Sequence, residues 1–207
     1  MNKILLYNPR AIAPGSPNYR IPNSILQVAA SVHGHYDYVI VDGNREADGL
    51  AKLRSYLRTG QFRYVGSTVM PGPQLKEAIR VTRAVRREFP EVINVWGGYF
   101  PSNQPEVVLR SGYVDFVVNG PGDQAFPALL RALEKGEPYE FINNLIFLDP
   151  DGQLVKTPKE SLLDPDALPR LPYESLNEFY PIEGYLKKTH LGQETIAYHS
   201  SLGCPFK

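Results

Sequence analysis

Apolar runs and amphipathic segments alternate along the first 148 residues of the chain. The apolar runs are short and continuous, which is typical of strands buried on both faces of a sheet. The segments between them repeat apolar residues at helical spacing, as Ile25, Val28 and Val32 do. The predicted strands are residues 3–7, 38–41, 64–69, 92–96 and 115–118, and the predicted helices are residues 24–32, 50–57, 74–88, 105–110 and 123–133.

Five successive strand–helix units predict one α/β domain, because right-handed crossovers between parallel strands place helices on both faces of a sheet. We therefore expect a Rossmann-like (flavodoxin-like) three-layer sandwich with a mostly parallel five-stranded sheet. Two further strand-like runs, residues 145–148 and 153–156, flank the turn Asp149-Pro-Asp-Gly152. This pattern predicts an added hairpin at the sheet edge.

The pattern changes at Thr157, where sustained periodicity ends. Because proline fixes its own φ angle and removes a backbone donor, the segment after Thr157 is expected to be an extended arm. The predicted boundaries are a first domain of residues 1–156 and a Pro-rich linker of residues 157–194. Five prolines fall within 25 residues of this linker: Pro158, Pro165, Pro169, Pro172 and Pro181.

The composition narrows the classes of function. The 22 Lys and Arg residues balance the 22 Asp and Glu residues, and zero net charge argues against a nucleic-acid backbone as the main partner. No apolar run approaches the roughly 20 residues that cross a bilayer, and Met1-Asn-Lys3 leads into a strand instead of a signal peptide. We therefore expect a cytoplasmic protein with no membrane partner. The single cysteine excludes an internal disulfide framework.

Open parallel sheets bind their ligands beyond the carboxyl ends of the strands. Glycine and proline punctuate the four predicted loops at that end, residues 8–21, 71–73, 97–101 and 119–123. Glycine lets the backbone approach a ligand closely, and proline fixes the loop shape without adding a donor. These residues are common in the connections of any α/β domain, but their presence in four loops on one edge predicts a broad cleft lined by backbone.

Several cofactor signatures are missing from the chain. The first strand–helix turn lacks Gly-x-Gly-x-x-Gly, and there is neither a Gly-x-x-x-x-Gly-Lys-Ser/Thr loop nor a Gly-x-Ser-x-Gly elbow. The sequence therefore gives little support to dinucleotide binding or to phosphate binding by a P-loop, although binding of a nucleotide in another way stays open. His33-Gly-His35 has no neighbouring cysteine or carboxylate cluster, which indicates solvated side chains instead of a metal site.

Three motifs resemble one known family. Residues 65–68 (VGST), 95–101 (VWGGYFP) and 114–123 (VDFVVNGPGD) are similar in order and spacing to the cobalamin-binding domain of B12-dependent radical S-adenosylmethionine (SAM) enzymes. Residues 163–173 resemble the connector that follows this domain in that family. The resemblance extends over essentially the whole chain.

The last residues carry a fourth motif. Residues 200–207 (SSLGCPFK) resemble the entry to the Cys-x-x-x-Cys-x-x-Cys motif of the radical SAM domain, with Cys204 at the position of the first metal ligand. Residues 195–207 are then expected to be the first strand and the start of the cluster loop of that domain. The sequence of 207 residues is accordingly expected to be a truncated part of a longer protein.

The resemblance implies cobalamin as the cofactor of this domain, with a [4Fe–4S] cluster and SAM in the intact enzyme. It also implies a methyltransferase that uses methylcobalamin and a 5′-deoxyadenosyl radical on an unactivated carbon. One thiolate cannot hold the cluster, so residues 1–207 alone are expected to be inactive. The implied cobalamin-binding residues are Tyr19, Arg20, Ser67, Thr68, Met70, Pro71, Gly97, Gly98, Tyr99, Phe100, Asn119, Gly120, Gly122 and Asp123.

Two departures from the family pattern matter. Pro121 and Asp123 stand where the family usually has the two Glu residues of a Gly-Glu-Gly-Glu motif, so only Asp123 keeps a carboxylate. No Asp-x-His-x-x-Gly follows the first strand. Because the family commonly lacks this histidine, the resemblance implies base-off cobalamin whose dimethylbenzimidazole tail lies along the sheet.

The same resemblance implies a small-molecule or peptide substrate and an electron donor such as flavodoxin or ferredoxin. Two other interpretations stay open at this point. One is a free-standing flavodoxin-like module that binds a nucleotide or has a regulatory role. The other is a nucleotide-sugar or NAD-dependent enzyme, which the missing glycine fingerprint disfavours.

Overall fold

A seven-stranded sheet forms the centre of the protein, whose computed structural model describes residues 2–13, 20–160 and 165–197. The strand order is β2-β1-β3-β4-β5-β6-β7, in which the first five strands are parallel and the last two are antiparallel. The strand order therefore reverses beside β1, at the point where α/β sheets bind ligands. The strands are β1 (Lys3–Asn8), β2 (Tyr38–Asp42), β3 (Phe62–Thr68), β4 (Ile93–Gly97), β5 (Phe116–Val118), β6 (Leu145–Leu148) and β7 (Leu154–Lys156).

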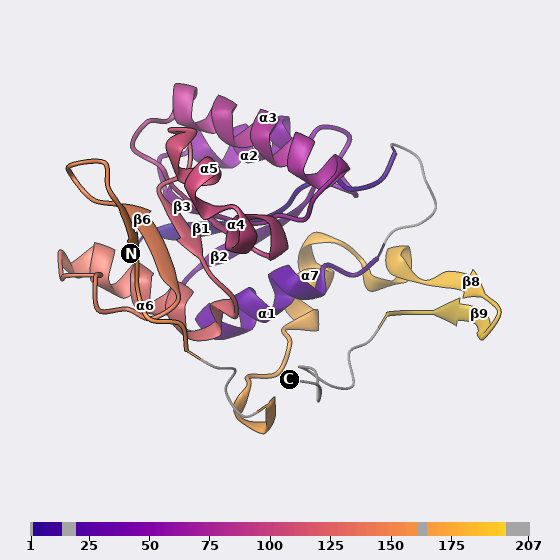
Figure 1. Ribbon diagram of the computed structural model, residues 1–207. Helices are drawn as coiled ribbons and strands as arrows, with labels where there is room; N and C mark the ends of the chain where they lie inside the picture. Colours follow the sequence, from indigo (N-terminus) through magenta and orange to yellow (C-terminus); the bar gives the residue numbers. More distant parts are fainter. Residues whose placement is uncertain (1, 14–19, 161–164, 198–207) are drawn as a thin grey trace.

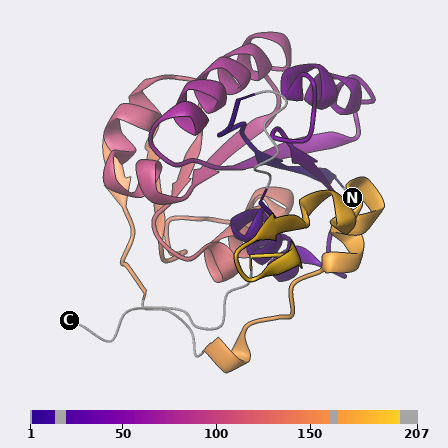
Figure 2. The same cartoon turned by 90° about the vertical axis from the view of Figure 1, so that its right-hand side faces the viewer.

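Helices cover both faces of the sheet, so the expected three-layer sandwich with an added hairpin is confirmed (Figures 1 and 2). Helices α1 and α6 pack on one face, and α2, α3 and α5 pack on the other. A buried apolar cluster lies between each helix layer and the sheet. The helices are α1 (Asn23–Val32), α2 (Gly49–Leu57), α3 (Pro73–Glu88), α4 (Tyr99–Asn103), α5 (Pro105–Arg110) and α6 (Gly122–Lys135).

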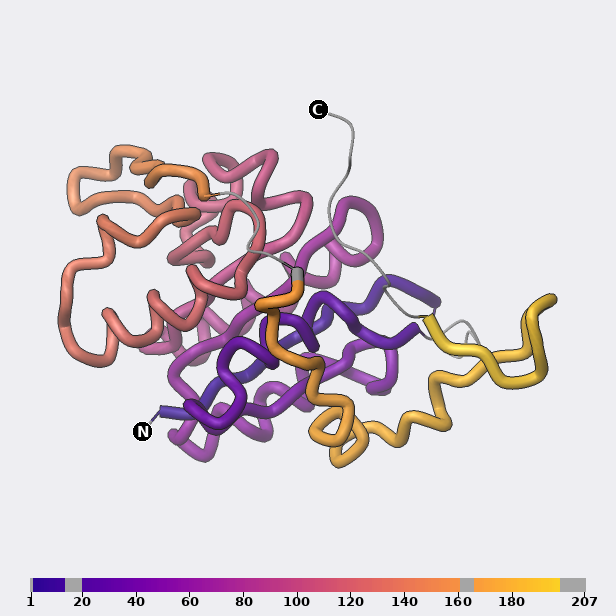
Figure 3. Tube along the Cα trace, turned by 90° about the horizontal axis from the view of Figure 1, so that it is seen from below, coloured from indigo at the N-terminus to yellow at the C-terminus, as the bar shows by residue number. Residues whose placement is uncertain are grey.

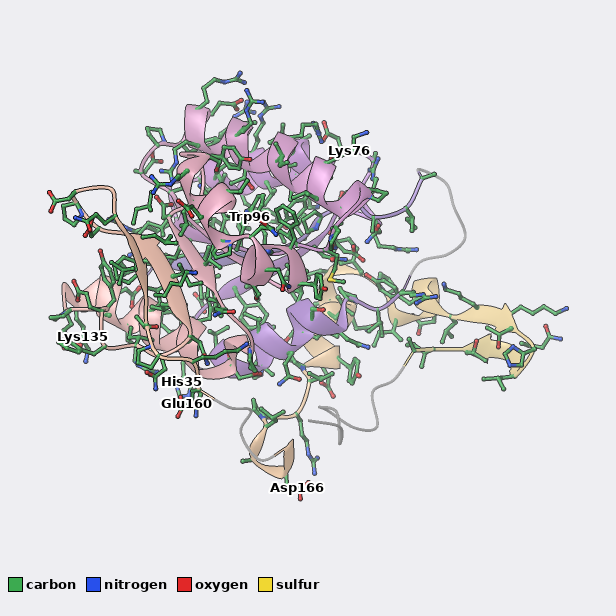
Figure 4. All side chains as sticks on the ribbon, viewed as in Figure 1. His35, Lys76, Trp96, Lys135, Glu160 and Asp166 are labelled. Atoms are coloured by element: carbon green, nitrogen blue, oxygen red, sulfur yellow. The ribbon has the colours of Figure 1, made fainter. Side chains whose placement is uncertain are left out.

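Local sequence explains where the longest helices start and stop. Proline is the first residue of α3, where its missing N–H costs nothing, and Gly136 ends α6 in the left-handed conformation at φ 65°. The buried face of α3 meets Trp96 of β4, whose indole N–H donates to Thr82 Oγ1 at 3.1 Å. Figure 4 shows Trp96 among the side chains inside the molecule, whereas Lys135 lies at its periphery.

The arm after Thr157 contains regular structure that the sequence pattern did not predict. It has a 3₁₀ turn at Pro165–Ala167, helix α7 (Tyr173–Phe179), a second 3₁₀ turn at Ile182–Tyr185, and the strands β8 (Lys187–Thr189) and β9 (Gly192–Thr195). Helix α7 has only seven residues, which is too short for a helical period to stand out among the prolines.

The arm divides into a docked part and a projecting part. Leu176, Tyr180 and Tyr185 are buried in the core cluster that α1 and α6 also line. The β8–β9 hairpin instead extends away from the sandwich (Figures 1 and 3), and none of its described residues belongs to a buried cluster. The first part of the arm therefore packs on the first domain, and the hairpin projects from it. The predicted boundary at residue 156 stays a prediction.

Within the described ranges, no helix has the length and apolar character needed to span a bilayer.

Candidate functional site

A cavity of about 400 Å³ lies under α1 and α6 at the carboxyl ends of the central strands. It reaches from β1 across β3 and β4 to β5, which is the edge where the sequence predicts a cleft. The lining is Leu6, Ser24, Ile25, Gln27, Val28, Gly66, Ser67, Thr68, Met70, Val95, Gly97, Gly98, Tyr99, Val118, Gly120, Pro121, Gly122, Asp123, Phe126 and Leu168.

Glycines in two strands shape this cavity in different ways. Side chains alternate along a strand, so Gly66 and Gly97 face the same helix layer as the core residues Tyr64 and Val95. A Cβ atom at Gly66 would meet Phe126 at 3.1 Å, whereas one at Gly97 would meet only the Val118 Cβ, at 3.9 Å. Gly97 therefore leaves open space in the slot between the sheet and the helices, whereas Gly66 lets Phe126 and Leu6 pack closely against β3.

The inner part of the slot is apolar, and polar groups lie near the helix ends. Ser67 and Thr68 end β3, and Asp123 lies in the first turn of α6. Gln27 of α1 donates from Nε2 to Asp123 Oδ1 at 2.6 Å, which ties the two helices together beside the cavity. A carboxylate in the first turn of a helix also interacts favourably with the helix dipole.

Two loops form the mouth of the cavity, and backbone hydrogen bonds hold them together. The Val69 N–H donates to Gly97 O at 2.8 Å, and the Phe100 N–H donates to Val69 O at 3.0 Å. Gly98 has φ +95°, and a Cβ there would approach the Val69 backbone nitrogen to 3.0 Å, so this position requires glycine. Met70 and Tyr99 remain exposed at this mouth, by 49% and 61%.

Nine of the cobalamin-binding residues implied by the sequence line this cavity. They come from the loops after β3, β4 and β5 and converge although they are up to 56 positions apart, from Ser67 to Asp123. The nine are Ser67, Thr68, Met70, Gly97, Gly98, Tyr99, Gly120, Gly122 and Asp123.

The other implied residues lie elsewhere. Phe100 packs into the cluster on the opposite face of the sheet, beside α3 and α5. Asn119 is outside the lining and donates its backbone N–H to Asn144 O at 2.8 Å. Pro71 and Arg20 are exposed and do not line the cavity. Tyr19 and Cys204 lie outside the described residues.

Eleven lining residues are not among the cobalamin-binding residues implied by the sequence, and most of them come from helices and strand interiors. Residues such as Ile25 and Val28 of α1 were assigned to core packing alone, and Phe126 of α6 was not singled out. One signal was available, because a glycine inside an apolar strand, as at Gly66, marks a close approach or an unfilled space. The overlooked lining residues are Leu6, Ser24, Ile25, Gln27, Val28, Gly66, Val95, Val118, Pro121, Phe126 and Leu168.

A second feature of the same sheet edge is the buried carboxylate of Asp42, which has no exposed surface. It accepts hydrogen bonds from Asn8 Nδ2 at 2.9 Å, from the Asn44 N–H at 3.1 Å and from the Tyr185 hydroxyl at 2.8 Å. Burial raises the pKa of the Asp42 carboxyl, and the bonds from Tyr185, Asn44 and Asn8 oppose that rise. Burial likewise raises the pKa of the Tyr185 hydroxyl, with Asp42 adding to the effect, so this hydroxyl stays a donor.

Other hollows of the surface lack these properties. A wider depression of about 570 Å³ is lined by Arg54, Arg80 and Arg83 on the outside of α2 and α3, away from the strand ends. His33 and His35 lie before β2, at the other edge of the sheet, where His33 Nδ1 is 2.9 Å from the Tyr38 hydroxyl. Among the described residues, no group of three potential metal ligands comes together.

The geometry of the cavity suits a flat and mostly apolar ligand with a polar fringe. Its volume lies in the range of cofactor sites. Of the described residues that line it, only Asp123 carries a charge, and none is a histidine.

The chain matches the model of a known domain family. The model of the B12 binding domain matches residues 15–130. Among curated proteins, the anaerobic magnesium-protoporphyrin IX monomethyl ester cyclase of Rubrivivax gelatinosus is 24% identical over 182 residues, which is 84% of this chain and 31% of that protein. An uncharacterized methyltransferase of Pyrococcus horikoshii is 25% identical over 186 residues, which is 89% of this chain and 39% of that protein.

Solved structures show the same fold. The cobalamin-dependent SAM radical enzyme OxsB, with aqua-cobalamin and SAM bound, superimposes with a TM-score of 0.68 at 18% identity, over 78% of this chain and 23% of that one. The radical SAM methyltransferase TsrM from Kitasatospora setae, with cobalamin and a [4Fe–4S] cluster bound, gives a TM-score of 0.65 at 18% identity, over 95% of this chain and 37% of that one.

The chain spans about a third of the length of the two curated proteins named above.

Proposed function

The chain belongs to the B12-binding domain family, and on that premise we propose that its cavity binds cobalamin as the cobalamin-binding region of a B12-dependent radical SAM enzyme. The observation that carries the proposal is the slot under α1 and α6. It lies at the carboxyl edge of the sheet, and nearly all of its lining lies inside the matched residues 15–130.

The residues present fit this cofactor. The dimethylbenzimidazole tail is flat and apolar, and the slot, which is open above Gly97, offers space for such a group between the sheet and α1 and α6. Thr68, which lies on the same face of β3 as Gly66, offers a hydroxyl group to the polar parts of the tail. Met70 and Tyr99 offer exposed apolar surface at the mouth for the corrin ring. When bound, cobalamin supplies a cobalt centre that carries a methyl group.

The protein's own contribution is to orient the ligand and keep water from it. Apolar side chains such as Val95 and Phe126 exclude water from the inner slot, and the backbone at Gly98 lets the two mouth loops approach each other closely. No histidine among the described lining residues is available to the cobalt. Because the dimethylbenzimidazole tail would lie in the slot, away from the cobalt, and no described lining histidine would replace it, we expect the bound cofactor to show the absorption of base-off cobalamin.

The experiment is to mix the purified protein with hydroxocobalamin, desalt the mixture and record the visible spectrum. We expect retained corrin absorption of the base-off type, and saturation on titration. Complete loss of colour on desalting would contradict the proposal. Apparent retention that bovine serum albumin reproduces under the same conditions would also contradict it.

The finer part of the proposal is that the whole enzyme transfers a methyl group to an unactivated carbon of a small-molecule or peptide substrate. We propose that it works in the cytoplasm with flavodoxin or ferredoxin as the electron donor. The curated methyltransferase of Pyrococcus horikoshii supports methyl transfer, whereas the cyclase of Rubrivivax gelatinosus supports ring closure as the other outcome.

The full-length enzyme distinguishes these two outcomes. Reconstituted enzyme is incubated with SAM whose methyl group carries deuterium, together with a cell extract, and the products are followed by mass spectrometry. Methyl transfer predicts products heavier by one labelled methyl group. A new product that forms together with 5′-deoxyadenosine and has gained no methyl group would instead favour ring closure.

A further inference from the structure

Buried polar side chains connect the ends of β1 and β2 at the carboxyl edge of the sheet. Asn8 and Asp42 are the last residues of these strands and lie opposite each other in the parallel register. Asn8 Nδ2 donates to Asp42 Oδ1 at 2.9 Å, and the Tyr185 hydroxyl donates to Asp42 Oδ2 at 2.8 Å. Tyr185 belongs to the arm, so the arm takes part in this edge although it is 143 positions from Asp42.

The same chain of hydrogen bonds continues toward the cavity through Gln74, in the first turn of α3. Gln74 Nε2 donates to Asn8 Oδ1 at 3.0 Å and to Pro9 O at 3.2 Å. Gln74 Oε1 accepts the backbone N–H of Met70 at 2.9 Å. Met70 lines the mouth of the cavity, so four side chains connect the arm with this loop. We call Tyr185, Asp42, Asn8 and Gln74 the edge network.

The orientation of each amide in the edge network follows from its neighbours. The Met70 N–H is only a donor, so Gln74 must turn its oxygen toward it and its NH₂ group toward Asn8. Asn8 therefore turns its oxygen toward Gln74 and its NH₂ group toward Asp42. The chain of donors ends at a carboxylate, which accepts from both sides. Replacement of one member therefore disturbs the orientation of the next.

Water has little access to these groups. Asn8 and Gln74 are each 7% exposed, Tyr185 is 1% exposed and Asp42 has no exposed surface. Leaving a buried polar group without its partner costs more free energy than the hydrogen bond itself contributes, so breaking any one bond of the network is unfavourable. Of its four members, none lines the cavity.

We propose that the edge network positions the Met70 loop, residues 69–72, at the mouth of the cavity, and that the docked arm completes it through the Tyr185 hydroxyl. Gln74 and Tyr185 are then positioning residues for the ligand, which they do not touch. The ligand part of this inference rests on the proposed function, because the loop faces the space assigned to cobalamin. The position of the loop itself is testable without any ligand.

The chain offers a specific probe of the Met70 backbone. It has only two methionines, and Met1 carries the α-amino group, which gives no amide signal. Protein labelled with ¹⁵N-methionine therefore shows one amide cross-peak, from Met70, and its shift and hydrogen-exchange rate report on the bond to Gln74.

Three variants of the intact protein test the network. Gln74→Leu removes the acceptor of the Met70 N–H, and we expect a shifted cross-peak and about tenfold faster exchange. Tyr185→Phe keeps the ring and removes only the hydroxyl, and we expect a smaller change in the same direction. Tyr180→Phe is the matched control, because the Tyr180 hydroxyl accepts from the Asp42 backbone N–H and donates to Glu46, and bonds none of the side chains that form the network. It should leave the Met70 cross-peak in place.

The outcomes separate this inference from the proposed function. An unmoved Met70 cross-peak in both Gln74→Leu and Tyr185→Phe would overturn the inference, whether or not the protein binds cobalamin. Equal shifts in Tyr185→Phe and Tyr180→Phe would also overturn it, since they would indicate general loosening of the arm. If the wild-type protein retains hydroxocobalamin, Tyr185→Phe should raise its Kd about three- to tenfold, with Tyr180→Phe near the wild-type value. If it retains none, the proposed function fails and the Met70 signal alone decides the inference.

Discussion

At the scale of single residues, the carboxyl edge of the sheet depends on one buried acid and a few glycines. Every described partner of the Asp42 carboxylate is a hydrogen-bond donor, so the ionised form fits the site although burial raises its pKa. The glycines contribute by having no side chain: Gly66 lets Phe126 pack against the sheet, and Gly97 leaves space. Asp42 is therefore expected to affect the stability of this edge, whereas Gly97 is expected to affect what the cavity can bind.

Replacement of Asp42 by alanine should destabilise the fold strongly. The change leaves the Asn8 amide and the Tyr185 hydroxyl without their shared acceptor in a buried place, so we expect a loss of about 2–4 kcal/mol. Urea unfolding followed by circular dichroism measures the free energy of unfolding of the variant and the wild type. Asp37→Ala is the control, because the Asp37 side chain is 79% exposed and pairs with Lys3 only at 3.9 Å. Similar losses in both variants would contradict this account of Asp42.

A side chain at Gly97 should close the cavity without breaking the strand. Gly97 has room for a Cβ, and valine suits a strand, but the two methyl groups of Gly97→Val extend into the slot. We expect the Kd for hydroxocobalamin to rise about tenfold or more, which corresponds to overpacking of roughly 1–3 kcal/mol. Absorbance titration measures the Kd.

Gly97→Ala gives the graded control for that variant. Its Cβ makes only ordinary contact with Val118, so its Kd should lie between those of the wild type and Gly97→Val. Thermal unfolding checks that both variants fold. A folded Gly97→Val protein that binds with wild-type affinity would show that the ligand does not occupy the slot.

At the scale of elements, an ion pair clamps α2 to α3 on the face opposite the cavity. Arg54 donates from Nε and from a terminal nitrogen to the two Glu88 oxygens, at 2.7 and 2.6 Å. These hydrogen bonds, with a further one from Arg87, lower the pKa of the Glu88 carboxyl from 4.5 to about 2. The two-pronged geometry makes this pair more specific than an ordinary surface ion pair.

The Arg54–Glu88 pair should make stability depend on pH in a defined window. Because folding lowers the pKa of Glu88, the pair stabilises the fold above pH 4.5 and loses its effect as pH falls toward 2. The Tm difference between the wild type and Glu88→Gln should therefore be present at pH 7 and shrink steadily below pH 4.5. Scanning calorimetry measures it, with exposed Glu91→Gln as the control. A difference that does not change with pH would contradict the assignment.

At the scale of the whole molecule, the arm is part of the folded domain. Leu176, Tyr180 and Tyr185 are buried against the core, and the Tyr180 hydroxyl donates to Glu46 Oε1 at 2.7 Å. Leu168 of the same arm lines the cavity. The arm therefore contributes to both the stability of the sandwich and the shape of its binding site.

Shortening the chain tests this contribution of the arm. A chain that ends after residue 168 keeps the cavity lining but loses the three buried side chains, so we expect its Tm to fall by roughly 5–15 °C. It should also bind more of the dye ANS, because apolar surface becomes exposed. A chain that ends after residue 186 keeps α7 and Tyr185 and loses the projecting hairpin and the residues that follow it, so its Tm should stay near the full-length value. Equal Tm values for all three chains would contradict the docked arm.

Most of the fold follows from the sequence, because the periodicity of apolar residues is a local property. The strands and helices of the sandwich lie within two residues of their predicted ends. The exceptions are short or composed of unusual residues. Helix α4 was expected to be a loop because it follows Gly97-Gly98 and contains Pro101, and α7 was hidden among prolines. Such elements owe their structure to packing more than to propensity.

The candidate site was predictable only in part. Nine of the fourteen implied cobalamin-binding residues line the cavity, because the carboxyl ends of parallel strands meet at one edge. Sequence alone did not separate Tyr99, which faces the cavity mouth, from its neighbour Phe100, which packs on the opposite face of the sheet. That distinction depends on how a few residues turn into α4.

By itself, the sequence determined the order of the elements, the parallel sheet, the edge that carries the loops and the glycines that line it. Only the tertiary structure decided how deep the cavity reaches under α1 and α6, and that Tyr185 reaches Asp42 across 143 positions. The physical reason is the distance along the chain over which each kind of interaction acts. Periodicity and turn chemistry act between near neighbours, whereas the slot and the edge network arise from side chains that meet only after the chain has folded.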